Sequence, residues 1–136
     1  MHPAKTSRDM CRILIVDDAP SVRESLEWLI EDEPGLTVIG SASNGTEALQ
    51  QTVNLKPDLI ILDIELPDVD GFHVTRQLKA MPLSPIVVLL SVHSDAQSRK
   101  HGFESGCDAY VEKAVGWPGL LSVIQNVLAN KDSKSP

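Results

Sequence analysis

Short apolar runs alternate with amphipathic segments along most of the chain. Five runs are rich in aliphatic residues and bounded by turn residues, which predicts β-strands. These predicted strands cover residues 12–16, 36–43, 59–63, 86–91 and 108–113. Continuous apolar runs such as RILIV and LIILD are typical of parallel strands that are buried on both faces.

A segment with helical spacing of its apolar residues follows each strand. The predicted helices cover residues 21–33, 46–55, 72–81, 94–106 and 117–131. The last is the clearest amphipathic helix, with one apolar face made of Trp117, Leu120, Leu121, Ile124, Val127 and Leu128. The fourth has few apolar residues, Ala96 and Phe103, so we expect an exposed and mobile element.

The order is therefore strand–helix repeated five times, which predicts an α/β fold with one parallel sheet and helices on both faces. Five strands favour the doubly wound, flavodoxin-like order 2-1-3-4-5. We expect one domain over residues 11–130, a disordered tail at 1–10, and a polar tail or linker stub at 131–136.

Polar side chains stand where four of the strands end. Asp17 and Asp18 follow the first strand, Asp63 ends the third, Ser91 ends the fourth and Lys113 ends the fifth. The carboxyl ends of parallel strands share one edge of the sheet, where ligands bind. We therefore expect these residues to converge on one crevice.

Three carboxylates held together repel one another unless a cation lies between them. Oxygen ligands with open water positions suit Mg²⁺. Ser91 can donate to a phosphoryl oxygen and Lys113 can neutralise another, which leaves Asp63 to act as a nucleophile and form an aspartyl phosphate.

Each of these residues also has an ordinary structural interpretation. The acidic pair can cap the first helix, Asp63 can form a turn, Ser91 can begin a helix, and Lys113 can be a solvated charge. All of them must then coincide at one sheet edge, and that coincidence favours a functional site.

Composition narrows the function classes. The 136 residues carry 12 Lys and Arg against 19 Asp and Glu, for a net charge of −7, which argues against nucleic-acid binding by this domain alone. The N-terminus lacks an apolar signal segment and no run is long enough to span a membrane, so we expect a cytoplasmic protein without membrane contact. Cys11 and Cys107 show no metal-like spacing and are expected to be reduced thiols.

Together these motifs resemble the receiver domains of two-component response regulators. The resemblance covers residues 12–130 and rests on the acidic pair of ILIVDD, on DIELPDVDG, on the hydroxyl residue after IVVLL, and on the Lys of YVEK. The stretch EPGLTVIGSASNGTEAL is most similar to receivers that precede helix-turn-helix DNA-binding domains, which implies a part in transcription regulation.

The resemblance implies that a sensor histidine kinase or a phosphotransfer protein donates a phosphoryl group to Asp63. It also implies that Asp18, Asp63 and the backbone carbonyl of Glu65 coordinate Mg²⁺ directly, with Asp17 acting through water. Ser91 and Lys113 would hold phosphoryl oxygens.

A switch is implied as well. We expect Ser91 to move toward the phosphoryl group and Tyr110 to turn inward, which changes the surface of the fourth helix, fifth strand and fifth helix. The fourth and fifth helices also offer a surface for a homodimer. Glu65 and His93 flank the path of the attacking water in the family and are expected to tune the lifetime of the phosphorylated state, unless they are ordinary solvated loop residues.

The sequence departs from the family pattern at three positions. Leu66 replaces a Met, which is a volume-conserving exchange. Val92 replaces an Ala beside the phosphoryl pocket and is expected to crowd it. Ala114 replaces a Pro after Lys113, and we expect a trans peptide bond there.

Three other functions compete with a phosphorylated receiver. An aspartate-nucleophile phosphatase of the haloacid dehalogenase type needs a second Asp two residues beyond the nucleophile, where this chain has Glu65, and a cap insertion is not present. A flavin-binding module needs a Gly-rich phosphate loop after the first strand, where this chain has VDDAPS. A non-phosphorylatable receiver that serves only as a protein-interaction domain also fits the fold.

Overall fold

The computed structural model describes residues 10–93, 95–113 and 117–133. The predicted tails at 1–10 and 131–136 fall mostly outside this part, and their boundaries stay predictions. Within it, Met10 is buried and the last helix continues to Ser133.

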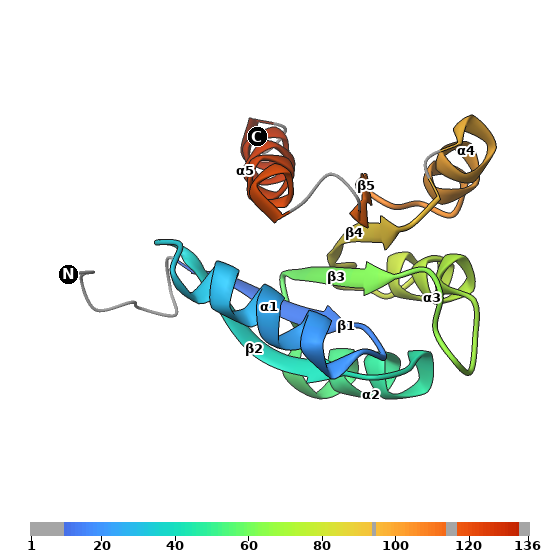
Figure 1. The fold of residues 1–136 in the computed structure, drawn as a ribbon, viewed down its shortest axis with the longest axis horizontal. Helices are drawn as coiled ribbons and strands as arrows, with labels where there is room; N and C mark the ends of the chain where they lie inside the picture. Colours follow the sequence, from blue (N-terminus) through green and yellow to red (C-terminus); the bar gives the residue numbers. More distant parts are fainter. Residues whose placement is uncertain (1–9, 94, 114–116, 134–136) are drawn as a thin grey trace.

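Five parallel strands form one sheet in the order β2-β1-β3-β4-β5, which confirms the predicted topology (Figure 1). The strands are β1 Cys11–Val16, β2 Leu36–Ala42, β3 Leu59–Asp63, β4 Ile86–Ser91 and β5 Ala109–Glu112. The helices between and after them are α1 Pro20–Glu31, α2 Gly45–Leu55, α3 Gly71–Lys79, α4 Ala96–Glu104 and α5 Trp117–Ser133.

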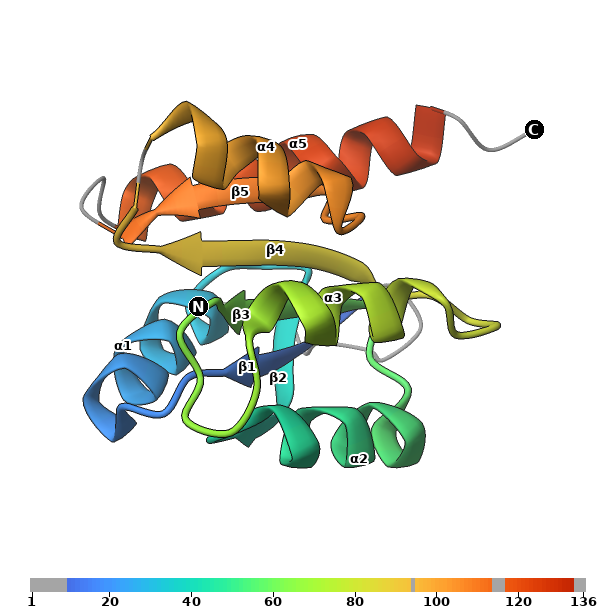
Figure 2. The same ribbon diagram turned by 90° about the vertical axis from the view of Figure 1, so that its right-hand side faces the viewer.

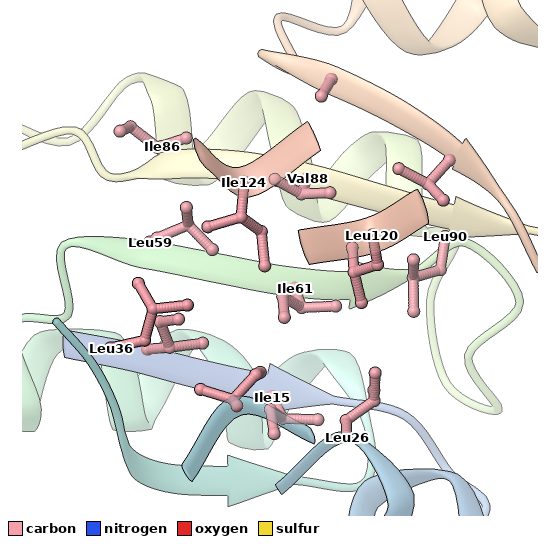
Figure 3. Close-up of a cluster of buried hydrophobic side chains, with 14 residues drawn as sticks. Ile15, Leu26, Leu36, Leu59, Ile61, Ile86, Val88, Leu90, Leu120 and Ile124 are labelled. Atoms are coloured by element: carbon pink, nitrogen blue, oxygen red, sulfur yellow. The ribbon is translucent and has the colours of Figure 1, made fainter. Parts of the chain in front are cut away.

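Helices cover both faces of the sheet, as the continuous apolar strands require. On one face, Leu26 of α1 and Leu120 and Ile124 of α5 pack over Ile15 and Ile61 of the central strands (Figure 3). On the other, α2 and α3 cover the alternate strand residues Leu14, Val16, Ile60, Leu62, Val87 and Leu89. Because successive strand residues point to opposite faces, both cores draw on the same strands.

Local signals fix where the helices begin. Pro20 stands at the first position of α1, where its missing N–H costs no hydrogen bond. Side-chain oxygens of Asn44, Asp70 and Asp95 cap α2, α3 and α4 respectively. The fourth helix has only Gly102 buried, so the predicted exposure of this element is confirmed, while its mobility stays a prediction.

The strand register brings the functional ends of the strands together. Val16 pairs with Leu62, Asp63 pairs with Leu90, and Ser91 pairs with Glu112. The residues that follow or end these strands therefore share one edge, toward which the arrowheads of β1, β3, β4 and β5 point in Figure 2.

Candidate functional site

Three carboxylates meet at this edge, as the sequence predicts. Asp17 and Asp63 are buried with 1% and 3% of their surface exposed, whereas Asp18 is exposed. One oxygen from each of the three lies within 4.8 Å of the others. Two buried anions and one exposed anion thus form a cluster that is open to solvent on the Asp18 side.

Lys113 reaches the same cluster from the end of β5. Its Nζ atom lies 3.1 Å from Asp17 Oδ2, to which it donates a hydrogen bond, and 3.4 Å from Asp63 Oδ2. Burial acts to lower the pKa of Lys113, but the hydrogen bond to Asp17 and the charge of Asp63 outweigh it, so the pKa is raised. Lys113 therefore brings a positive charge to the site at neutral pH.

The carboxyl group of Asp63 gives up its proton less readily than an ordinary aspartate. Burial raises its pKa to about 6, and the nearby charge of Asp17 acts in the same direction, while the Glu65 N–H and Lys113 partly oppose the shift. Without a further cation this carboxyl group carries an unfavourable charge at neutral pH.

Asp17 is already committed on both oxygens. Oδ1 accepts a hydrogen bond from the Ala19 N–H at 2.9 Å, and Oδ2 accepts from Lys113 at 3.1 Å. Asp18 and Asp63 offer carboxylate oxygens at the same cluster, and such oxygens are ligands that fit Mg²⁺.

Ser91 and Tyr110 are linked through the backbone of His93. The Ser91 hydroxyl oxygen accepts a hydrogen bond from the His93 N–H at 2.9 Å, and the Tyr110 hydroxyl donates to the His93 carbonyl at 2.8 Å. Ser91 is fully buried and Tyr110 is 5% exposed. Tyr110 thus already occupies the inward position that we expected it to reach after phosphorylation.

Glu65 and His93 face each other beside the cluster. Glu65 Oε1 lies 3.6 Å from His93 Nε2, and both side chains are more than half exposed. The Glu65 N–H donates to Asp63 Oδ1 at 3.1 Å. The two residues that the sequence singles out for tuning are therefore in contact with one another at the rim of the site.

Two residues of the site escaped the sequence analysis. Arg23 donates from Nη1 to the Asp17 carbonyl at 2.6 Å, and Asp68 accepts hydrogen bonds from the start of α2. For Arg23 a signal existed, because a residue in the first turn of α1 can reach back to the end of β1. No sequence signal links Asp68 to a helix 22 residues away.

The departures from the family pattern are partly visible. Leu66 packs against the core cluster under α2 and α3, in keeping with a volume-conserving exchange. Val92 is 58% exposed, beside Ser91. Ala114 and the side chain of Trp117 lie outside the described residues.

In the part of the chain that the structure describes, Cys11 and Cys107 are free thiols, and no helix is long and apolar enough to cross a membrane.

Comparison with known proteins agrees with this geometry. Residues 13–125 match the family model of the response regulator receiver domain. The nitrate/nitrite response regulator protein NarL of Escherichia coli is 30% identical over 126 residues, which are 93% of this chain and 58% of that protein. A protein-glutamate methylesterase/protein-glutamine glutaminase of Syntrophus aciditrophicus is 38% identical over 106 residues, which are 76% of this chain and 30% of that protein.

Among solved structures, a LuxR-family two-component response regulator from Aurantimonas sp. superposes with a TM-score of 0.83 at 31% identity, over 89% of this chain and 86% of that one. The predicted likeness to this group of receivers is thereby confirmed. The chain spans only 30% and 58% of the two curated relatives' lengths.

Proposed function

The chain belongs to the response regulator receiver domain family, and on this premise we propose that it accepts a phosphoryl group on Asp63 in a Mg²⁺-dependent reaction. The observation that carries the proposal is the meeting of buried Asp63 with Asp17, Asp18 and Lys113 at one sheet edge. Phosphorylation then changes the surface formed by α4, β5 and α5, through which the domain signals.

Asp63 is the proposed nucleophile. A carboxylate oxygen of Asp63 forms a bond to phosphorus while the P–N bond of a donor phosphohistidine breaks, and the leaving imidazole nitrogen keeps the electron pair and takes a proton from water. The pKa of about 6 leaves Asp63 mostly ionised at neutral pH, as this attack requires.

A magnesium ion would be held by carboxylate oxygens of Asp18 and Asp63 and by the backbone carbonyl of Glu65, with Asp17 acting through water. When bound, it supplies positive charge to the carboxylates and to the phosphoryl oxygens. The close approach of three carboxylate oxygens supports a cation at this place.

Ser91 and Lys113 are proposed to hold the phosphoryl group. A hydroxyl group can accept and donate at the same time, so Ser91 can keep its bond from the His93 N–H while its own O–H turns to a phosphoryl oxygen. Lys113 lies 3.4 Å from Asp63 Oδ2 and can neutralise another oxygen. Both groups act by position and charge, as phosphoryl transfer requires.

Tyr110 is the proposed switch residue. Because its hydroxyl is bound to the His93 carbonyl and the His93 N–H is bound to Ser91, a movement of Ser91 changes how strongly the inward position of Tyr110 is favoured. Tyr110→Phe removes the hydroxyl alone. Partner binding that responds fully to a phosphate mimic in this variant would refute the proposed coupling.

Glu65 and His93 are proposed to tune the lifetime of the phosphorylated state, because their side chains meet at the rim of the site. Exchanging both residues should change the dephosphorylation rate. An unchanged rate would assign them to the ordinary solvated loop.

The phosphodonor is proposed to be a sensor histidine kinase or a phosphotransfer protein. Four further points remain predictions from the sequence. They are a homodimer through α4 and α5, a part in transcription regulation through a further domain, the absence of nucleic-acid binding by this domain alone, and a cytoplasmic location. The position two residues beyond Asp63 holds Glu65, whereas a phosphatase of the haloacid dehalogenase type needs an Asp there, and this difference supports a receiver.

Intact-mass measurement with acetyl phosphate tests the proposed reaction. With Mg²⁺ present, the protein should gain the mass of one phosphoryl group. Omission of Mg²⁺, or the exchange Asp63→Asn, should abolish the gain. An unmodified wild-type protein would favour the interaction-only receiver, and turnover of a small phosphate ester would favour the phosphatase.

A further inference from the structure

The loop between β3 and α3 is attached at its tip to the first turn of α2. Asp68 Oδ1 accepts a hydrogen bond from the Gly45 N–H at 2.8 Å, and Oδ2 accepts from the Thr46 N–H at 2.9 Å and from the Thr46 hydroxyl at 2.8 Å. These bonds, first that from Gly45, hold the pKa of Asp68 well below its usual range. Asp68 is therefore charged at neutral pH and faces the positive end of the helix.

Close packing accompanies these hydrogen bonds. A Cβ atom added at Gly45 would lie 2.4 Å from Cγ2 of Val69 and 2.9 Å from Cγ2 of Val74, well inside van der Waals contact. The first turn of α2 thus rests directly on Val69 of the loop and on Val74 in the first turns of α3.

The other end of this loop belongs to the acidic cluster. The Glu65 N–H donates to Asp63 Oδ1 at 3.1 Å, and the Gly71 N–H donates to the Ile64 carbonyl at 2.9 Å. A bridge between Glu65 and Asp70 closes the loop at its base. The segment that carries the Glu65 carbonyl is therefore fixed at its base to β3 and at its tip to α2.

We infer that Asp68 is a positioning residue for the cation site, because it holds the tip of the loop on α2 and so fixes the Glu65 carbonyl beside the acidic cluster. The inference rests on the proposed function. Coupling between two sites is reciprocal. A cation that is held more tightly because of the Asp68 contact must therefore strengthen that contact in return.

A helix cap alone is the competing explanation for Asp68, and the chain offers a matched control. Asn44 Oδ1 accepts a hydrogen bond from the Glu47 N–H at 2.8 Å, one residue after the two N–H groups that Asp68 binds. Asn44→Ala and Asp68→Ala each remove caps from the same helix turn, but only the second releases the loop.

The test is magnesium titration of the 136-residue protein by calorimetry, with amide hydrogen exchange of Gly45 and Thr46 followed by NMR. Asp68→Ala should weaken Mg²⁺ binding by about fivefold or more, while Asn44→Ala should leave it within about twofold of wild type. In wild type, Mg²⁺ should slow exchange of the two amides, and in Asp68→Ala this effect should be lost. Asp68→Asn keeps one acceptor oxygen and serves if the alanine variant unfolds.

The inference would be overturned if the Asp68 variants bind Mg²⁺ as tightly as wild type, or if Asn44→Ala weakens Mg²⁺ binding by the same factor as Asp68→Ala. It would also be overturned if Mg²⁺ does not change the amide exchange rates of Gly45 and Thr46 in wild type. A wild-type protein that binds no Mg²⁺ and accepts no phosphoryl group would instead overturn the proposed function, and the inference with it.

Discussion

Removing the charge of Asp63 should stabilise the protein when no cation is present. The pKa of Asp63 is raised from 3.8 to about 6, first by burial and then by Asp17. The stability that the protonated group contributes is therefore present below pH 3.8 and is lost as the pH rises through about 6. Above about pH 7 the wild-type protein bears the full cost, which Asp63→Asn avoids.

The size of this effect follows from the two pKa values. Their separation corresponds to about 3 kcal/mol, and solvent in the open crevice reduces it to about 1.5 kcal/mol. The melting temperature of Asp63→Asn in EDTA should exceed that of wild type by roughly 5 °C at pH 7.5. The difference in melting temperature should fall to about a third at pH 4.5, where Asp63 is protonated in most folded wild-type molecules.

Thermal melts followed by circular dichroism measure both values, and denaturant titrations give the free energy of unfolding. Glu24→Gln serves as the control, because it removes one exposed negative charge from α1 and should change the melting temperature little at either pH. Excess Mg²⁺ should reverse the order of wild type and Asp63→Asn, since only wild type keeps all three carboxylates. An Asp63→Asn protein that is no more stable than wild type in EDTA at pH 7.5 would refute the electrostatic reasoning.

Three further changes probe other parts of the site. Lys113→Gln removes a charge that lowers the pKa of Asp63, so the carboxyl titration midpoint in ¹³C NMR should rise above about 6, and an unmoved midpoint would contradict the contact. Gly102→Ala would place a Cβ atom 2.7 Å from Tyr110 Cδ2, so the ring must shift, and the protein should lose about 1–3 kcal/mol of stability. Second-derivative absorption of this single tyrosine should report greater exposure of the ring to solvent. An unchanged spectrum would refute the packing argument. Val92→Ala opens the rim beside Ser91 and should speed phosphorylation by acetyl phosphate several-fold; an equal rate would show that Val92 does not restrict access.

Much of the fold could be predicted because the strands and helices are visible in the local pattern of apolar residues, and their alternation along the chain favours one sheet topology. LIILD and IVVLLS are observed as the strands Leu59–Asp63 and Ile86–Ser91. Short runs that are apolar at all but their last position, bounded by turn residues, are typical of parallel strands buried on both faces. The alternation of strands and helices predicts the strand order and a parallel sheet. In a parallel sheet the strands all end at one edge, which places Asp17, Asp63 and Lys113 together there.

The remaining features depend on packing that periodicity does not encode. Tyr110 lies inward because Gly102 leaves room for its ring and the His93 carbonyl accepts its hydroxyl. Asp68 caps α2 because the β3–α3 loop folds back onto that helix, which depends on side-chain packing in three dimensions. Such contacts join residues whose separation in the sequence carries no repeating pattern.

The most direct test of the central claim is to locate the phosphoryl group after reaction with acetyl phosphate and Mg²⁺. Borohydride reduction converts an aspartyl phosphate to homoserine, and peptide mass spectrometry identifies the residue. We predict homoserine at position 63 and at no other aspartate. Homoserine at Asp17 or Asp18, or modification that persists in Asp63→Asn, would contradict the assignment of Asp63 as the phosphoacceptor.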